Sequence, residues 1–167
     1  RQWTWMDEGL NSFMEFMAEQ ELGTDFPSRR GPAKNIVPYM SGDQKFLEPI
    51  MSNSESIIQF GNNAYGKPAT GLNILRETIM GRELFDYAFK VYSNRWKFKH
   101  PTPEDFFRTM EDASAVDLDW FFRGWFYSTD FVDIGIKEVK QYYISETPTV
   151  ALKDAKVRKG RFGVDRG

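Results

Sequence analysis

The chain has 167 residues, of which 41% are hydrophobic and 16% aromatic, and this composition predicts a globular domain with a dense aromatic core. Its formal net charge of −2 provides no overall attraction to nucleic acid or to anionic lipid. The chain contains no cysteine, which excludes disulfides and thiolate metal sites, and no apolar run long enough to span a bilayer.

The first predicted element is a helix over residues 7–21. Apolar side chains recur at helical spacing and predict the face towards the core: Leu10, Phe13, Met14 and Met17. Polar side chains fall together on the opposite face, as expected for a solvated surface: Glu8, Ser12, Glu15 and Glu19. Gly23 and Pro27 are expected to end the helix.

The next part of the chain carries weaker signals. Residues 23–42 are predicted to form a loop, because prolines and glycines recur through them. A short helix is predicted near 43–51, although Pro49 limits its length. Residues 52–68 give a mixed pattern with one weak apolar run at Ile57 and Ile58.

Beyond Pro68 the helical pattern strengthens. One helix is expected over about 71–80 and a second from Leu84 to near His100. Thr102 is a good N-cap residue before Pro103 and two acids, which predicts a helix start whose Phe106, Phe107 and Met110 face inward. A last helix, 118–127, is aromatic nearly all round and is therefore expected to be buried, with Asp117 as its cap.

The carboxy-terminal part differs in character from the rest. Alternating residues predict a strand over 132–144, and the tail 151–167 carries six basic residues against two acidic ones. This pattern divides the chain into a helical part, 1–130, and a strand and tail, 131–167, that lead towards a following region. The basic tail lacks the interleaved aromatic residues of a nucleic-acid interface, so no nucleic-acid partner is predicted.

The titratable residues provide no self-contained active site. The chain has one histidine, His100, at a predicted helix end, where capping or solvation is the simpler role. One histidine cannot complete a zinc site that needs two or more, and neither EF-hand spacing nor a phosphate loop is present. The residue types alone therefore favour a helical domain without its own catalytic centre.

One segment is more specific than the rest, running from Trp3-Thr4-Trp5 through Met6-Asp7-Glu8-Gly9-Leu10. It resembles the third-ligand segment of the aminopeptidase N family of gluzincin zinc metallopeptidases. In that family a His-Glu-x-x-His helix supplies two zinc ligands and the general base, and a Glu on the next helix supplies the third ligand. The resemblance implies that Glu8 is a zinc ligand. The alternative from helix pattern alone is a solvated carboxylate.

The resemblance also implies that the chain is a fragment. The His-Glu-x-x-His motif would lie upstream of Arg1, so the other zinc ligands are expected outside this chain. The implied fold is mostly α: the helical lobe of a thermolysin-like catalytic domain, with a short β segment near the carboxy terminus.

Two further segments extend the resemblance over roughly residues 1–130. Tyr65-Gly66-Lys67-Pro68 resembles the family's Tyr-x-Lys-Gly, in which the tyrosine hydroxyl stabilises the oxyanion of the tetrahedral intermediate, and this implies a catalytic role for Tyr65. Pro68 departs from the family, which has glycine there. The aromatic segment 102–126 resembles the end of the family's helical lobe, and its rings are assigned to core packing.

By resemblance, the parent protein is a hydrolase that removes amino-terminal residues from peptides with a zinc-activated water. The chain alone is expected to be inactive, because it carries one ligand and no general base. The alternative is a noncatalytic, peptidase-like helical interaction module. A resemblance to bacterial relatives mildly favours an exported or periplasmic location.

Overall fold

The computed structural model describes residues 2–23, 28–130 and 135–140. The chain divides into two units, Arg1–Val132 and Asp133–Gly167. All the helices found in the described residues belong to the first unit, which confirms the predicted mostly α-helical fold. In chain order the α-helices are α1 (Trp5–Leu22), α2 (Ala33–Met40), α3 (Lys67–Ile74), α4 (Arg82–Trp96), α5 (Pro103–Ser114) and α6 (Asp119–Phe126). Three shorter helical segments accompany them: η1 (Gln44–Phe46), a 3₁₀ turn, and the π-helical η2 (Gly61–Gly66) and η3 (Leu75–Ile79).

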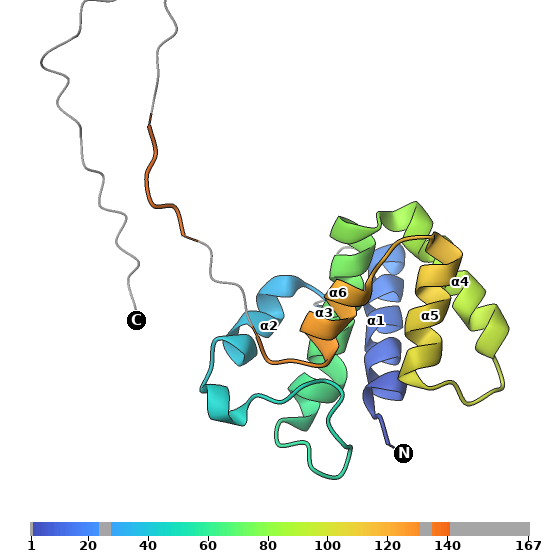
Figure 1. The fold of residues 1–167 in the computed structure, drawn as a ribbon, viewed down its shortest axis with the longest axis horizontal. Coiled ribbons are helices and arrows are strands. Elements are labelled where there is room, and N and C mark those ends of the chain that lie inside the picture. Colours follow the sequence, from blue (N-terminus) through green and yellow to red (C-terminus); the bar gives the residue numbers. More distant parts are fainter. Residues whose placement is uncertain (1, 24–27, 131–134, 141–167) are drawn as a thin grey trace, which may run out of the picture. The chain divides into compact units, whose positions relative to one another are not determined.

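Helix α1 occupies a central place in the helical unit, and α3 and α5 flank it in the view of Figure 1. Its apolar side chains join the main core, where Phe13 packs edge-on against Phe85 of α4 with ring centroids 5.4 Å apart. Its other side packs against η2 and α3. The two faces of α1 therefore contact different parts of the unit.

The core is built from aromatic rings that α1, α5 and α6 contribute. Trp5 lies 5.8 Å from Phe107 in a stacked geometry, 5.9 Å from Phe106 edge-on and 4.8 Å from Phe126. Phe107 also stacks on Phe122 at 4.2 Å. Rings of this size bury large apolar areas, so these contacts dominate the cohesion of the unit. The inward direction predicted for Phe106, Phe107 and Met110 is confirmed.

The start of α5 has the capping geometry that its sequence predicts. The Thr102 hydroxyl accepts a hydrogen bond from the Asp105 amide at 3.4 Å, and the Asp105 carboxylate accepts one from the Thr102 amide at 2.9 Å. This reciprocal capping box satisfies two amides that would otherwise lack partners at the helix end.

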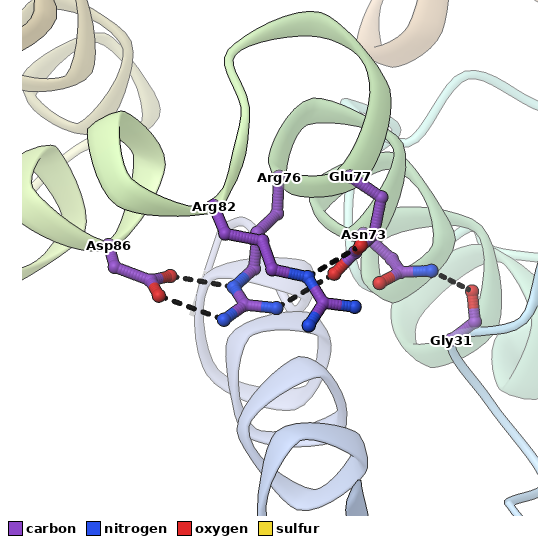
Figure 2. Close-up of polar contacts among 6 residues, drawn as sticks. All are labelled: Gly31, Asn73, Arg76, Glu77, Arg82 and Asp86. Atoms are coloured by element: carbon purple, nitrogen blue, oxygen red, sulfur yellow. Dashed lines mark hydrogen bonds and ion pairs between the residues drawn. The ribbon is translucent and has the colours of Figure 1, made fainter.

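A buried arginine connects η3 to α4 (Figure 2). Arg76, only 8% exposed, donates two hydrogen bonds to the Asp86 carboxylate, at 2.6 and 2.8 Å, and a third to Glu77 at 2.7 Å. Glu77 in turn accepts a hydrogen bond from Arg82 at 2.8 Å. Because the guanidinium is paired on both sides, its burial is compensated, and the network fixes the turn between the two elements.

The structure differs from the sequence predictions between residues 23 and 66. Helix α2 lies inside the predicted loop: Pro32 stands at its N-cap, and the inward residues Ile36 and Tyr39 are three positions apart. The predicted helix near 43–51 is reduced to the three-residue turn η1. Pro38 lies inside a helix of only eight residues, so proline here does not mark a loop.

Two predictions of burial were also wrong. Met14 is 48% exposed, whereas Ser12, placed on the solvated face, is only 3% exposed, because that face packs towards η2 and α3. In α6 the rings of Phe121, Phe122 and Phe126 are buried as predicted, but Trp120 is 62% exposed. Asp117 accepts a hydrogen bond from the Asp119 amide at 3.2 Å at the start of this helix.

The described part of the predicted strand, residues 135–140, is exposed and forms no regular structure. The rest of that strand and the tail 151–167 lie outside the described residues. Among the helices that the structure describes, none combines the length and the apolar character needed to cross a bilayer.

Candidate functional site

Glu8 lies in the first turn of α1 and is half-buried. Its amide donates to the Thr4 carbonyl at 3.0 Å, and the Thr4 hydroxyl donates to Ser54 at 2.6 Å, so the start of the helix is tied to the loop beside it. An acidic side chain in the first turn is also favoured by the helix dipole. These contacts fix the backbone at the start of the helix that carries Glu8.

A glycine next to Glu8 brings α1 close to α3. A Cβ at Gly9 would lie 2.7 Å from Cγ of Pro68, a distance that real side chains essentially never show, and 3.1 Å from the carbonyl oxygen of Ala64, which is also tight. Pro68 is buried in the first turn of α3, where its missing amide is tolerated. The departure of Pro68 from the family pattern is therefore accommodated by a tight contact with Gly9.

This close approach places the turn η2 beside Glu8. Tyr65 lies in this π-helical segment, a local geometry that recurs at functional sites. The fully buried Asn63 anchors the segment, since its amide group donates to the carbonyls of Glu48 at 3.1 Å and Pro49 at 2.9 Å. The backbone that carries Tyr65 is thus fixed on both sides.

The structure brings together the two side chains that the sequence singled out. Interaction with the nearby Glu8 carboxylate, more than the partial desolvation, raises the pKa of the Tyr65 hydroxyl above its ordinary value. Asp7 adds a smaller effect in the same direction. At neutral pH the tyrosine therefore keeps its proton and remains a hydrogen-bond donor.

Arg30 is a third member of this group that the sequence analysis missed. Its guanidinium carbon lies 4.2 Å from the centroid of the Tyr65 ring, and its Nη1 lies 3.5 Å from the Ser12 hydroxyl of α1. The residue belongs to the stretch predicted as loop and follows no periodic pattern. The sequence feature that could have pointed to Arg30 is its place in a pair of arginines directly before Gly31 and Pro32.

Open space borders Arg30 on two sides. A hollow of about 340 Å³ is lined in part by Arg30, Asn62 and Gly66, and another of about 320 Å³ in part by Ser12, Glu15 and Arg30. Glu8 and Tyr65 line neither hollow, so the open space adjoins the guanidinium and not the two residues that the motifs singled out.

Lys67 belongs to the same sequence motif as Tyr65, but its side chain is directed towards Ser128. It is 3% exposed, and its ammonium donates to the Ser128 carbonyl at 3.2 Å. Burial lowers the pKa of Lys67 to about 8, although the charge of Asp130 acts in the opposite direction. Trp125 donates from its indole to the Lys67 carbonyl at 2.9 Å and covers Gly71, where a Cβ would collide with the ring. Lys67 thus joins α3 to α6 and serves the fold.

The described residues contain no group of three or more His, Cys, Asp or Glu side chains placed to hold a metal ion. His100 is exposed beyond the end of α4. Glu8 is a half-buried carboxylate near the Tyr65 hydroxyl, and a carboxylate of this kind has the chemistry of a single zinc ligand. The residues fit zinc only as a contribution to a site completed by side chains outside this chain.

Comparison with known proteins adds an independent line of evidence. Residues 1–125 match the Peptidase family M1 domain. The chain is 29% identical over 160 residues to aminopeptidase N of Escherichia coli (strain K12). This match covers 90% of the chain and 16% of that protein. It is 22% identical over 142 residues to glutamyl aminopeptidase of Homo sapiens, covering 81% of this chain and 15% of the relative.

A third relative, probable aminopeptidase 2 of Sulfurisphaera tokodaii, is 26% identical over 129 residues, or 72% of this chain. The matched region is 16% of that relative, so the chain corresponds to a small part of each of these proteins. No solved structure gives a significant match.

Proposed function

The chain belongs to peptidase family M1, and from this premise we propose that it supplies one zinc ligand and one catalytic side chain to a metallo-aminopeptidase. The observation that carries the proposal is the proximity of Tyr65 to Glu8, whose carboxylate raises the pKa of the tyrosine hydroxyl. The close approach of Gly9 to Ala64 and Pro68, which lie on either side of Tyr65 in the sequence, supports it.

Glu8 is the proposed metal ligand. Zinc in this family of enzymes takes three protein ligands and, when bound, supplies Lewis-acid chemistry that activates water and polarises a carbonyl. The backbone that carries Glu8 is held by the contacts of Thr4 and by the Gly9–Pro68 packing. A fixed backbone suits a ligand, because metal geometry tolerates little displacement.

Tyr65 is the proposed donor to the developing oxyanion of the substrate. Its raised pKa keeps the hydroxyl protonated, so that it can donate to an oxyanion that forms on a substrate bound beside Glu8. A donor aimed at charge that develops in the transition state contributes typically about 10²–10³ in rate. Arg30, whose guanidinium lies over the Tyr65 ring, borders two hollows that could take part of a peptide.

The proposed substrates are peptides, cleaved at the amino-terminal residue. The support is the family and the relatives, which are named as aminopeptidases. The general base, the other ligands and the groups that recognise the free amine are assigned to parts of a longer polypeptide. The 167-residue chain by itself is therefore proposed to be inactive.

The test uses the polypeptide encoded by the whole reading frame, with Glu8→Gln and a matched control, Glu21→Gln, which replaces an exposed carboxylate on the same helix. Zinc content by elemental analysis and turnover of an aminoacyl-coumarin substrate are measured. Glu8→Gln should lose most of both, and Glu21→Gln should retain both.

Full zinc content and turnover in Glu8→Gln would reduce Glu8 to an ordinary helix-face carboxylate. A wild-type polypeptide that binds no zinc and shows no turnover would favour the noncatalytic interaction module instead. Turnover by the pure 167-residue chain would contradict the assignment of the remaining groups to other parts of the protein.

A further inference from the structure

Arg30 contacts both the helix of Glu8 and the ring of Tyr65. Its guanidinium carbon lies 4.2 Å from the ring centroid, within the range of a cation–π contact. Its Nη1 reaches the hydroxyl of the buried Ser12, one turn beyond Glu8 on α1, at 3.5 Å. Arg30 therefore connects the two elements whose separation sets the distance between Glu8 and Tyr65.

The Tyr65 ring needs such support, because it is not enclosed by the core. Its side chain is only half-buried, and its hydroxyl lies near Glu8. One further ring, Phe60, packs edge-on against it with centroids 5.9 Å apart, but Phe60 is itself exposed. Without the guanidinium, the ring would lose the contact over one of its faces, and rotation about the Cα–Cβ bond would move the hydroxyl away from Glu8.

We propose that Arg30 is a positioning residue that stacks on Tyr65 and holds its hydroxyl in the orientation required for catalysis. The catalytic part of this inference rests on the proposed function of Tyr65. The planar guanidinium matters as well as the charge, since lysine cannot both stack on a ring and donate from a fixed fork. Arg30→Lys should therefore behave more like Arg30→Gln than like the wild type.

The first test concerns the orientation of the ring and needs no activity. In the 167-residue chain labelled with ¹³C in the tyrosine rings, the NMR signals of Tyr65 are assigned by their loss in Tyr65→Phe. Arg30→Gln and Arg30→Lys should shift and broaden these signals and leave the other tyrosines in place. Arg108→Gln, which removes an exposed arginine on α5, is the matched control and should shift none of them.

The outcomes of this test separate positioning from general stability. Unfolding temperatures are recorded for each variant. Unchanged Tyr65 signals in Arg30→Gln would overturn the proposal, whatever the change in unfolding temperature. Shifts in every tyrosine signal would also overturn it, because they would indicate a general effect on the fold.

The second test measures turnover in the full-length protein as a double-mutant cycle. Arg30→Gln should lower kcat about tenfold with little change in KM, and it should cause no further loss in the Tyr65→Phe background, because it acts through that hydroxyl. An equal further loss there would overturn the proposal. Full activity in Tyr65→Phe would instead refute the proposed function of Tyr65, and with it the catalytic part of this inference, while the NMR result still decides whether Arg30 orients the ring.

Discussion

The aromatic core and the Glu8–Tyr65–Arg30 group are both built on α1, but they are held together in different ways. In the core, each ring contacts several others: Phe106 alone lies near Trp5, Tyr92 and Phe122. In the site, each residue depends on one or two specific contacts, such as the stacking of Arg30 on Tyr65. One face of α1 therefore packs into the aromatic core, and the other lies against the residues of the site.

From this difference we predict that the largest losses of stability come from substitutions in the core. Phe106→Ala removes a fully buried ring and leaves a cavity among aromatic neighbours, which should cost about 3–5 kcal/mol of unfolding free energy. This is a large fraction of the total stability of a typical domain. Urea denaturation followed by circular dichroism measures the loss.

Phe98→Ala is the matched control for this substitution. Phe98 is 100% exposed, so the same change in chemistry should alter the unfolding free energy by less than about 0.5 kcal/mol. Equal losses in the two variants would show that burial of rings does not dominate the stability of this unit.

The sequence predicted the core better than the site, and the reason is physical. A repeated apolar spacing and a capping box are local signals, and they located α1, α4, α5 and α6. The turn η2 escaped prediction, because a π-helical turn leaves no periodic pattern in five or six residues. Helix α2 was missed since its prolines were interpreted as loop signals.

Glu8 and Tyr65 were found through motifs, but their contact could not be predicted. It depends on the absence of a side chain at Gly9 and on the shape of Pro68, a long-range fit that no single segment encodes. Arg30 lies in a stretch without pattern, and only the folded chain brings it over the Tyr65 ring. The sequence motifs therefore identify the proposed reacting groups, whereas the proposed positioning residue is found only in the tertiary structure.

Lys67 provides a second prediction, because it is a charged side chain that is buried and makes its contacts within the fold, not in the site. Its pKa of about 8 in the folded state lies below the 10.5 of an unfolded lysine. Between these values the unfolded chain keeps the proton and the folded chain does not, so unfolding takes up a proton and stability rises with pH. The full gain is about 3 kcal/mol, reached as the pH passes 10.5.

The gain is measured as the difference in unfolding free energy between the wild type and Lys67→Met at a series of pH values from 7 to 10. The wild type should gain on the variant as the pH rises above 8. Lys90→Met, which changes an exposed lysine on α4, corrects for the general effect of alkaline pH. A constant difference between wild type and Lys67→Met would contradict the burial of the ammonium.

Gly9→Ala tests the boundary between the core and the site. The added methyl would collide with the rigid Pro68 ring and the Ala64 carbonyl, so α1 and α3 must separate. Overpacking of this kind costs about 1–3 kcal/mol, and the better helix propensity of alanine offsets about 1 kcal/mol of it. Thermal unfolding should show a net loss, smaller than that of Phe106→Ala.

The same variant should also disturb the site, since the separation moves Glu8 away from Tyr65. The ring signals of Tyr65 in the ¹³C-labelled chain should therefore shift in Gly9→Ala. Ala18→Gly, an exposed position on α1, is a control for helix propensity alone and should leave these signals unchanged. A Gly9→Ala chain of wild-type stability with unchanged Tyr65 signals would show that the close approach is dispensable.

Tyr65→Phe should have the smallest effect on folding and a large effect on chemistry. The variant removes one accessible hydroxyl and keeps the ring under Arg30, so the unfolding temperature should stay within about 2 °C of the wild type. In the full-length protein, kcat should fall about 10²–10³-fold, because the donor to the oxyanion is lost. Tyr87→Phe, at an exposed tyrosine of α4, should change neither quantity. The contrary outcome is a Tyr65→Phe variant with unchanged kcat and an unfolding temperature lowered as much as in Gly9→Ala. The hydroxyl would then contribute to stability and not to chemistry, and α1 would not have one face for the core and another for the site.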